Sequence, residues 1–515
     1  MNGAEALVKT LIKAGVEVCF ANPGTSEMHF VAALDRHPEM RCVLCLFEGG
    51  ATGAADGYAR MKGDAAVTLL HLAPGFGNAF ANLHNARKAG SGMVNVMGEH
   101  ATWHLQFESP LRGNTVGISQ AVSHWTRMST DATTVADDGA AAVRMARSEG
   151  GRIATLILPA NTAWEEAPGG PAETAAPPPR RRPRPADIAA AAEILRQPGA
   201  TLMVGGEILA GSAAVLAARI VSKTGCGLMA PYFVPRQRRG AGSVPMARMV
   251  YPVDANVALL ADRKTIVLCG ATRPTSFFAY PGKPSLPEAP GSHLIPLCDP
   301  EMDAAWTLGA LAEELGAGTT PAGTLTPLDL PDLPTGLVTP EKVGAALAAL
   351  LPEEAIVVDE SVTASRFVWA ATETARPHDW LKTMGGAIGD CLPMAAGAAV
   401  ACPDRKVVAL TGDGSAMYTL QSLWTMARER LDVCVVVFAN RSYRILHEEL
   451  RNVGASQAGR NAARVFDIVD PPLDWVALAK GHGVEAVYAG ESEALVAALR
   501  RGLGEPGPFL IEVPC

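Results

Sequence analysis

Two polar residues that could hold a metal ion with a phosphate group stand 27 positions apart in the last third of the chain. Asp413 lies between Gly412 and Gly414, directly after the apolar run KVVALT. Asn440 follows the next apolar run, DVCVVVFA. Carboxylate and amide oxygens suit Mg²⁺, and glycines let the backbone approach a bulky phosphate closely. The pattern favours a magnesium diphosphate site, although GDG alone is also a common turn.

The elements around these residues explain how they could meet. Both apolar runs are typical of buried strands, and SAMYTLQSLWTMARER between them has apolar residues at helical spacing, which predicts one helix. A right-handed strand–helix–strand crossover brings the carboxyl ends of parallel strands to one edge of a sheet, where ligands bind. We therefore expect Asp413 and Asn440 to lie side by side, near backbone N–H groups that could receive phosphate oxygens. The chain has no P-loop or complete dinucleotide fingerprint.

The same alternation of short apolar runs and Ala-rich stretches extends over all 515 residues. Strands that are apolar throughout and separated by helices indicate parallel sheets covered on both faces, so we predict three doubly wound α/β domains. Two proline-rich segments, AAPPPRRRPRPAD and GTTPAGTLTPLDLPDLPTGLVTP, are expected to be linkers. The predicted boundaries are 1–174 for the first domain, 175–187 for a linker, 188–317 for the central domain, 318–340 for a linker and 341–515 for the last domain.

The composition excludes some function classes. The formal charge of −8 and the pI of about 5.8 give no basic surface for nucleic acid. No run of eighteen apolar residues without charge offers a membrane span. The ten cysteines lie mostly in apolar runs, which is typical of reduced thiols, so we expect a cytoplasmic protein.

Further motifs with possible chemistry lie elsewhere in the chain. Glu48 follows the apolar run CVLCLF, where a carboxylate is costly unless it is paired or used, although an acid at a helix start is a simpler interpretation. His71 ends the strand-like run AVTLLH, and Thr25 lies in the turn NPGTSE. The segment TMGGAIGDCLPMAAGAA, residues 383–399, is a Gly-rich loop that leads into a helix.

Together these motifs resemble the thiamine diphosphate-dependent enzymes related to benzoylformate decarboxylase, pyruvate decarboxylase and the acetolactate synthase large subunit. The resemblance covers nearly the whole chain and implies pyrimidine-binding, central and diphosphate-binding domains, in that order. It also implies that Mg²⁺ is bound by Asp413, Asn440 and the main-chain carbonyl of Ser442. The cofactor-binding positions that it implies are Gly386, Ile388, Gly412, Asp413, Gly414, Ser415, Asn440, Ser442 and Tyr443.

The resemblance gives roles to three residues around the cofactor rings. Glu48 matches the glutamate that hydrogen-bonds the pyrimidine and promotes the imino form, which removes the C2 proton. Ile388 matches the apolar side chain that bends the cofactor, and the carbonyl of Gly386 should accept a hydrogen bond from the aminopyrimidine. A strand-to-helix turn with Ile388 in the core is the alternative.

Substrate handling is implied for two residues of the first domain. His71 matches a histidine of benzoylformate decarboxylase and could transfer a proton near neutral pH, although an ordinary strand-end histidine is the alternative. Thr25 stands where that enzyme has a serine that contacts the substrate carboxylate. The NPGT turn could equally be a helix cap.

The chain also departs from benzoylformate decarboxylase. Phe277 occupies the position of that enzyme's second catalytic histidine, so this proton relay is missing. After Asn440, the pocket rim is expected to carry Ile445, His447 and Glu449, the last two being either polar contacts or part of a solvated helix face. A pocket for a phenyl ring is therefore not expected.

The resemblance implies a 2-oxo-acid decarboxylase or carboligase that uses thiamine diphosphate and Mg²⁺ and acts through a C2 carbanion and enamine. An acetolactate synthase-like acyl transferase is one alternative, and a regulatory nucleotide-binding paralogue without turnover is another. The central domain has no defensible phosphate fingerprint, so FAD is not expected. Because the family builds each site from two subunits, the resemblance implies a homodimer or homotetramer.

Overall fold

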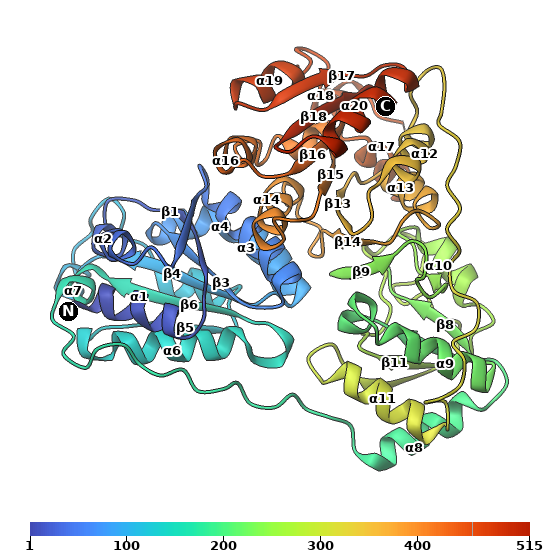
Figure 1. Ribbon diagram of the computed structural model, residues 1–515, viewed down its shortest axis with the longest axis horizontal. Helices are drawn as coiled ribbons and strands as arrows, with labels where there is room; N and C mark the ends of the chain where they lie inside the picture. Colours follow the sequence, from blue (N-terminus) through green and yellow to red (C-terminus); the bar gives the residue numbers. More distant parts are fainter. Residues whose placement is uncertain (456) are drawn as a thin grey trace.

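Three β-sheets flanked by helices make up the chain (Figure 1). The computed structural model describes residues 1–455 and 457–515. The first sheet and its helices occupy the left of Figure 1, the second lies at the lower right, and the third lies at the top. Within the described residues, all pairs of sheet strands are parallel except one, so the predicted fold class is confirmed.

The first sheet has six parallel strands in the order β2-β1-β3-β4-β6-β5. Its strands are β1 (Val18–Asn22), β2 (Arg41–Leu44), β3 (Ala66–Leu70), β4 (Met93–Glu99), β5 (Trp125–Met128) and β6 (Ile153–Pro159). Its helices are α1 (Gly3–Lys13), α2 (Met28–Arg36), α3 (Glu48–Lys62), α4 (Leu72–Ala89), α5 (Thr115–Gln120), α6 (Val135–Ala146) and α7 (Ala160–Trp164). Strands β3, β4 and β6 are buried along their whole length, as their mostly apolar sequences predict.

The second sheet has five parallel strands in the order β10-β8-β7-β11-β12. Its strands are β7 (Ala200–Val204), β8 (Gly227–Ala230), β10 (Ala247–Arg248), β11 (Thr265–Cys269) and β12 (His293–Cys298). The helices of this region are α8 (Pro185–Leu195), α9 (Ala214–Thr224), α10 (Val253–Leu260) and α11 (Ala304–Glu314). These elements surround a hydrophobic core of their own.

The third sheet has seven strands in the order β17-β18-β16-β15-β13-β14-β9. Its strands are β9 (Arg236–Arg239), β13 (Ala355–Glu360), β14 (His378–Lys382), β15 (Val407–Gly412), β16 (Val433–Phe438), β17 (Glu485–Tyr488) and β18 (Phe509–Val513). Its helices are α12 (Pro340–Leu350), α13 (Ser365–Ala371), α14 (Cys391–Ala401), α15 (Asp413–Ala416), α16 (Ser422–Glu429), α17 (Arg444–Asn452), α18 (Arg460–Phe466), α19 (Trp475–Gly481) and α20 (Ser492–Gly504). Strand β9 comes from the middle of the chain and is the antiparallel exception.

Helices α3 and α14 join the first and third sheets into one packed body. Their crossing is close because a Cβ on Gly57 would overlap the backbone of Met394, and a Cβ on Gly397 would overlap that of Ala54. Buried apolar residues of both regions form one continuous cluster around this contact. The helix that begins at Glu48 is therefore held against the helix that follows the Gly-rich loop.

A stack of cationic and aromatic side chains joins the second and third sheets. The rings and cations alternate, with separations between 3.5 and 5.1 Å from charge centre to ring centroid. In order, the members are Lys382, Tyr232, Arg248, Trp369, Arg239 and Trp380. Burial lowers the pKa of Arg239 to about 9 and that of Arg248 to about 10, because a desolvated guanidinium is costly. Contacts with aromatic faces offset part of that cost.

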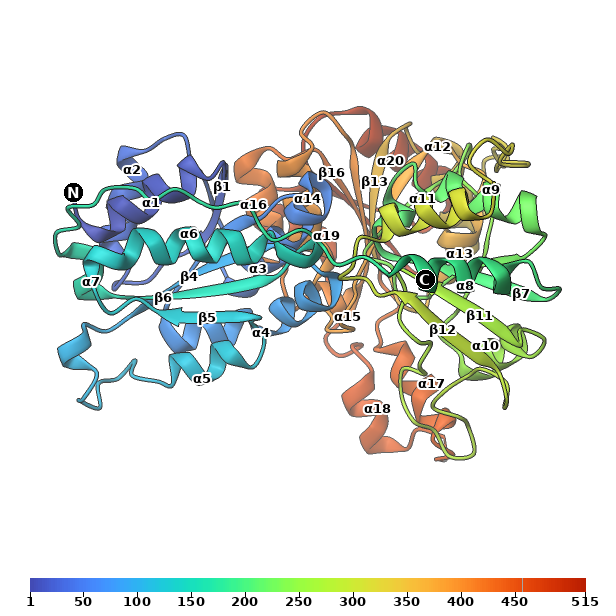
Figure 2. The ribbon, with the colours of Figure 1, turned by 90° about the horizontal axis from the view of Figure 1, so that it is seen from below.

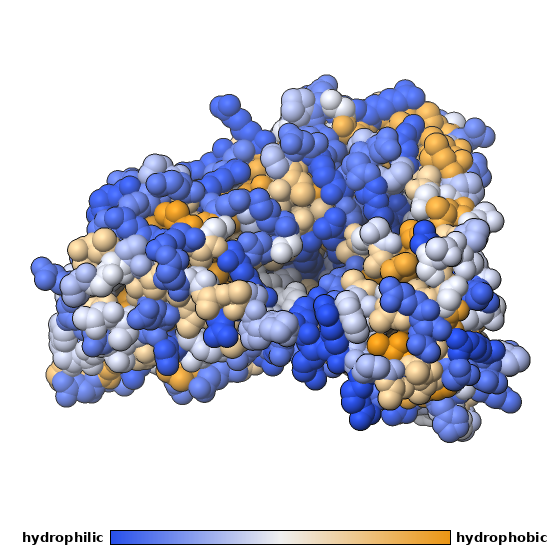
Figure 3. All heavy atoms as spheres, turned by 60° about the horizontal axis from the view of Figure 1, so that its bottom comes forward, coloured by the Kyte–Doolittle hydropathy of each residue, from blue (hydrophilic) through white to orange (hydrophobic). Residues whose placement is uncertain are grey.

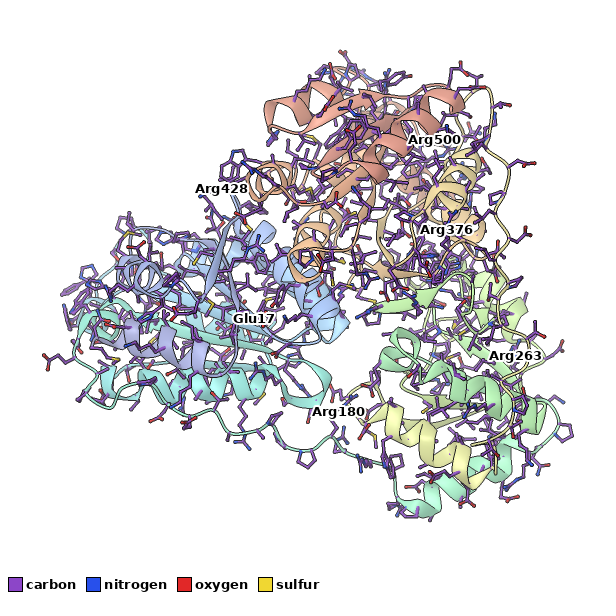
Figure 4. The ribbon with its side chains drawn as sticks, viewed as in Figure 1. Glu17, Arg180, Arg263, Arg376, Arg428 and Arg500 are labelled. Carbon is purple, nitrogen blue, oxygen red and sulfur yellow. The ribbon has the colours of Figure 1, made fainter. Side chains whose placement is uncertain are left out.

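Long segments without helix or strand connect the sheets. In Figure 4, Arg180 lies in the segment between α7 and α8, and its guanidinium forms an ion pair with Glu207 at 2.6 Å. A second such segment between α11 and α12 runs up the right side of Figure 1. The domain boundaries given above stay a prediction.

Figure 2 shows that α17 and α18 project from the side of the third sheet. Neither helix has a buried residue.

The face drawn in Figure 3 is mostly hydrophilic, with smaller hydrophobic areas. Among the described residues, no helix combines the length and apolar character that crossing a bilayer requires.

Candidate functional site

Asp413 and Asn440 lie at the carboxyl ends of two neighbouring strands of the third sheet, as their spacing predicts. Strands β15 and β16 are hydrogen-bonded neighbours, with Gly412 opposite Phe438. Asp413 is buried, and its carboxylate accepts hydrogen bonds from the N–H groups of Arg441 at 2.6 Å and Gly414 at 2.9 Å. Burial raises the pKa of Asp413, and these N–H groups oppose the rise. A bound cation would stabilise the ionised form further.

The residues around this pair form a tight turn. Asn440 Oδ1 accepts a hydrogen bond from the N–H of Ser442 at 2.9 Å. A Cβ on Gly414 would overlap the ring of Tyr443, so glycine is needed there. Ser415 is buried in α15, and Gly412 precedes this helix as its cap. The structure thus brings the predicted positions 412–415 and 440–443 together.

The predicted single helix after Asp413 is wrong. The segment forms two helices, α15 and α16, separated by residues 417–421. The Thr419 hydroxyl donates to the carbonyl of Gly389 at 2.8 Å, and a Cβ on Gly389 would lie 2.5 Å from that of Tyr418. These contacts with the Gly-rich loop replace the helical path that local spacing favoured.

The Gly-rich loop between β14 and α14 holds Gly386 and Ile388. Gly386 is exposed, with a φ of 77°, and Ile388 is half-buried. A Cβ on Gly386 would lie 2.7 Å from the ring of Phe277, so the second-sheet region reaches this loop. Phe277 belongs to a group of contacting aromatic residues that also includes Phe233, Tyr251 and Phe278.

Glu48 is the first residue of α3 and is 6% exposed. Its Oε2 accepts a hydrogen bond from the side chain of Asn78 at 2.9 Å. A Cβ on Gly75 would lie 2.7 Å from Glu48 Oε1 and 3.2 Å from the Cβ of His71. Glu48 and His71 are therefore close neighbours, separated by a position that has no side chain.

His71 lies directly after β3, caps the start of α4 and contacts the turn that follows β1. Its Nδ1 lies 3.0 Å from Glu27 Oε2 and 3.3 Å from the Ser26 hydroxyl. Thr25 is exposed, and the contact to His71 is made by its neighbour Ser26. Sequence reasoning missed both Ser26 and Glu27, although both stand in the turn NPGTSE.

Sequence reasoning also missed three asparagines on one face of α4, two of which tie the first region to the Gly-rich loop. Asn78 binds Glu48, whereas Asn82 Nδ2 lies 2.7 Å from the carbonyl of Gly49 and 3.4 Å from that of Gly389. Asn85 exchanges hydrogen bonds with the backbone of Ala387 at 2.8 and 3.2 Å. Their spacing of four and three residues is the helical signal that could have revealed this face. The start of α3 and the loop around Ile388 are thus linked within one chain.

The predicted rim residues lie on α17. Ile445 is half-buried. His447 Nε2 lies 2.9 Å from Asp467 Oδ1, which also accepts a hydrogen bond from the Ser442 hydroxyl at 2.9 Å. Glu449 accepts hydrogen bonds from the Tyr251 hydroxyl at 3.1 Å and the Tyr280 hydroxyl at 2.8 Å. These contacts are with other residues of the protein, so a role of His447 or Glu449 in contacting a substrate stays a prediction.

The donor set at the third-sheet edge suits a hard cation. Among the described residues, no group of three His, Cys, Asp or Glu side chains could hold a metal ion. A metal here would rely on the carboxylate of Asp413 together with amide and carbonyl oxygens, which is an arrangement that Mg²⁺ accepts and Zn²⁺ does not favour. These residues therefore fit a magnesium-bound diphosphate.

Comparison with known proteins agrees with this geometry. Residues 1–124 match the family described as thiamine pyrophosphate enzyme, N-terminal TPP binding domain. Residues 361–513 match the corresponding C-terminal TPP binding domain. The first matched segment contains Glu48 and His71, and the second contains Asp413 and Asn440.

Two curated relatives align along nearly the full chain. A Mycobacterium tuberculosis protein named "Putative acetolactate synthase large subunit IlvX" is 47% identical over 519 residues, which cover 100% of this chain and 99% of the relative. Benzoylformate decarboxylase of Pseudomonas aeruginosa is 29% identical over 544 residues, covering 99% and 98%.

A solved structure has the same fold. The 4-hydroxybenzoylformate decarboxylase of Rhodococcus jostii RHA1, which is thiamine diphosphate-dependent, superposes with a TM-score of 0.84 at 24% identity, covering 100% of this chain and 99% of that one. The family models, the full-length relatives and the paired strand ends agree. The chain therefore belongs to the thiamine diphosphate-dependent enzyme family, whose members here include decarboxylases and acetolactate synthases.

Proposed function

We propose that this enzyme is a Mg²⁺-dependent 2-oxo-acid decarboxylase or carboligase. The observation that carries the proposal is the placement of Asp413 and Asn440 at neighbouring strand ends, in a turn where backbone N–H groups hold both side chains. The two full-length relatives, one named for acetolactate synthase and one for benzoylformate decarboxylase, support the choice of substrate class.

The third-sheet edge would hold the cofactor. Asp413, the Asn440 side chain and the main-chain carbonyl of Ser442 would bind Mg²⁺, and residues 412–415 with Tyr443 would receive the diphosphate. Gly386 and Ile388 would contact the rings. Thiamine diphosphate, when bound, supplies a nucleophilic carbon that cleaves or forms a bond beside a carbonyl.

Residues at the carboxyl ends of the first-sheet strands would transfer protons. Glu48, buried at the start of α3, would exchange a proton with the pyrimidine ring. His71 would deliver a proton to the product or remove one. Ser26 contacts His71 whereas Thr25 is exposed, so a hydroxyl contact to the substrate carboxylate would come from either of two adjacent residues.

One assay tests the activity. The protein is incubated with Mg²⁺, thiamine diphosphate and a panel of 2-oxo acids, with and without an aldehyde acceptor. Release of CO₂ with an aldehyde product is expected for a decarboxylase, and a hydroxyketone is expected for a carboligase. Removal of Mg²⁺ with a chelator should abolish either product. Absence of both products over the whole panel would contradict the proposal and favour a paralogue without turnover.

An acetolactate synthase-like acyl transfer is the second candidate, because the 47% identical relative carries that name. Formation of acetolactate from pyruvate would identify it.

We propose that no FAD is needed, and the visible absorbance of a flavin in the purified protein would contradict that part of the proposal. The ten free cysteines agree with a cytoplasmic location, which we also propose.

We further propose a homodimer or homotetramer in which each site uses two subunits. Mixing Glu48→Gln and Asp413→Asn subunits tests this, because a shared site would leave one of the two sites in a mixed dimer intact. Activity should return on mixing, up to about half of the wild-type value per mixed dimer. Each variant alone should remain inactive. If mixing restores nothing although mixed dimers form, the site is built within one chain, as the link through α4 would allow.

A further inference from the structure

Glu27 is a buried carboxylate directly behind His71. It is 4% exposed and lies in the turn between β1 and α2, at the carboxyl edge of the first sheet. A carboxylate this deep is costly unless donors surround it. Here two donors and one ring nitrogen of His71 do so.

The two oxygens of Glu27 divide these contacts. Oε1 accepts a hydrogen bond from the Ser26 hydroxyl at 2.6 Å. Oε2 accepts one from the N–H of Gly24 at 2.8 Å and lies 3.0 Å from His71 Nδ1. An ionised carboxylate can only accept, so the ring nitrogen that faces it must carry the proton.

The surrounding backbone leaves room for this arrangement at two glycines. A Cβ on Gly98, in the neighbouring strand β4, would overlap Glu27 Oε1. A Cβ on Gly24 would overlap the His71 ring at Nδ1. Any larger residue at either position would displace the carboxylate or the ring.

We infer that Glu27 is a positioning residue that holds the neutral His71 ring with its proton on Nδ1 and its lone pair on Nε2. Nε2 is separated from Nδ1 by the carbon Cε1, and the nitrogen that lies within hydrogen-bond distance of Glu27 is Nδ1. The His71 side chain is 19% exposed, whereas that of Glu27 is 2% exposed, so Glu27 forms the inner wall and His71 faces outward. His71 would thus present a proton acceptor when neutral and a donor once protonated, which is what a reversible proton carrier needs.

A purely structural role is the alternative. Glu27 also closes the turn through Gly24, and a turn-closing carboxylate would not need to face His71. The two roles differ in one observable, the protonation pattern of the His71 ring.

The test is ¹⁵N NMR of the full chain with ¹⁵N-labelled histidine, at a pH where the ring is neutral. The His71 signals are assigned by their loss in His71→Asn. Wild-type protein should show a protonated Nδ1 and an unprotonated Nε2. In Glu27→Gln the pattern should shift toward a protonated Nε2, because the amide can donate to Nδ1. Gly98→Ala, which displaces the carboxylate without removing its charge, should shift the pattern in the same direction.

Thr25→Ala is the matched control. It removes a hydroxyl from an exposed residue of the same turn and leaves the contacts of Glu27 with Ser26 and His71 in place, so the His71 pattern should not change. An unprotonated Nδ1 in the wild-type protein would overturn the inference. So would a change caused by Thr25→Ala and not by Glu27→Gln.

The kinetic consequence of the inference rests on the proposed function. Glu27→Gln should lower kcat about 100-fold with KM changed less than about threefold, since only proton transfer is affected. Loss of substrate binding with an unchanged kcat would contradict a role through His71. The NMR result does not require turnover, so an enzyme inactive on every 2-oxo acid would refute the proposed function and leave the positioning of His71 decided by the spectrum.

Discussion

Glu48 is the residue whose removal should separate chemistry from cofactor binding. It is buried at the helix start, whereas the proposed metal ligands lie on another sheet. Glu48→Gln keeps the size and the hydrogen bond from Asn78 to an oxygen, and removes only the ionisable group. We expect turnover to fall by about 10² to 10⁴. Thiamine diphosphate binding, measured by calorimetry, should change little.

Glu17→Gln is the control for this experiment. Glu17, which is labelled in Figure 4, is an exposed acid of the same region and binds Lys62 at 2.7 Å. Its substitution should leave turnover unchanged. Equal losses in both variants would point to general damage of the first region and would remove Glu48 from the proposed mechanism.

The buried carboxyl group of Glu360 should make the stability of the protein depend on pH. Its carboxyl group lies at the end of β13 and accepts hydrogen bonds from the N–H of Asp390 at 2.9 Å and the Thr411 hydroxyl at 3.3 Å. Burial raises the pKa of Glu360 from 4.5 to about 7, and the hydrogen bonds oppose this only partly. Burial also raises the pKa of Asp390, whose two side-chain oxygens are buried without a hydrogen-bond partner.

The sign of the effect follows from proton linkage. Below pH 4.5 the Glu360 carboxyl is protonated in both the folded and the unfolded chain, so its contribution to stability is fully present. Between pH 4.5 and about 7 the unfolded chain loses the proton first, so stability falls as pH rises, by at most about 3 kcal/mol. Glu360→Gln should flatten the fall of the urea midpoint between pH 5 and about 7. Glu341→Gln, at an exposed acid, should leave the slope unchanged.

The residues of the candidate site were predictable to different degrees. Asp413 and Asn440 could be placed together from sequence, because two buried strands and a crossover fix which ends are adjacent. Glu27 could not, since its contact with His71 joins side chains 44 positions apart, and its approach depends on Gly98 in a third strand. Such side-chain packing across strands leaves no periodic signal in the sequence.

At the level of elements, the crossing of α3 and α14 positions Glu48 relative to the Gly-rich loop. Gly397→Ala would place a methyl group onto the carbonyl of Ala54, and the helices would have to move apart. Overpacking of this kind costs about 1 to 3 kcal/mol. We expect a lower urea midpoint and reduced turnover, because Glu48 begins α3 and Ile388 lies in the loop just before α14.

Gly309→Ala provides the comparison. Gly309 is also a helical glycine, in α11, but a Cβ there would meet open space. This substitution should be neutral or stabilise the helix by up to about 1 kcal/mol. A similar destabilisation of both variants would show that the crossing is not tightly packed.

At the level of the whole molecule, the cation–aromatic stack should control how firmly the central region is attached. Arg239 and Arg248 both contact Trp369. Their guanidinium carbons lie 3.5 and 3.6 Å from the centroid of its ring. Trp369→Ala would leave two poorly solvated cations without this ring, and we expect a loss of about 3 kcal/mol or more. Limited proteolysis within residues 318–340 should become faster.

Trp306→Ala tests whether the stack matters more than an exposed pair. Trp306 contacts Arg182 at 4.4 Å and is 39% exposed. Its loss should cost less than about 1 kcal/mol. Equal sensitivity of the two variants to protease would mean that the stack does not hold the central region in place.

The three-sheet plan could be predicted because continuous apolar strands between helices allow few alternatives. Strand β9 could not, since RQRR has no apolar residue and is typical of a surface loop. Tertiary partners make it a strand: Arg236 pairs with Asp379 at 2.9 Å, and the Arg239 side chain reaches the carbonyl of Trp369 at 2.7 Å.

Strand β9 also bears on how genes of this family could recombine. A chimera that took its middle third from a relative would bring a foreign edge strand to β14, and the donor segment would have to match the recipient at Asp379 and Trp369. A mismatch would leave the backbone of β14 open to pairing with another chain. The middle domain therefore cannot be exchanged independently of the third sheet. Residues 236–239 are expected to evolve together with residues 369–382.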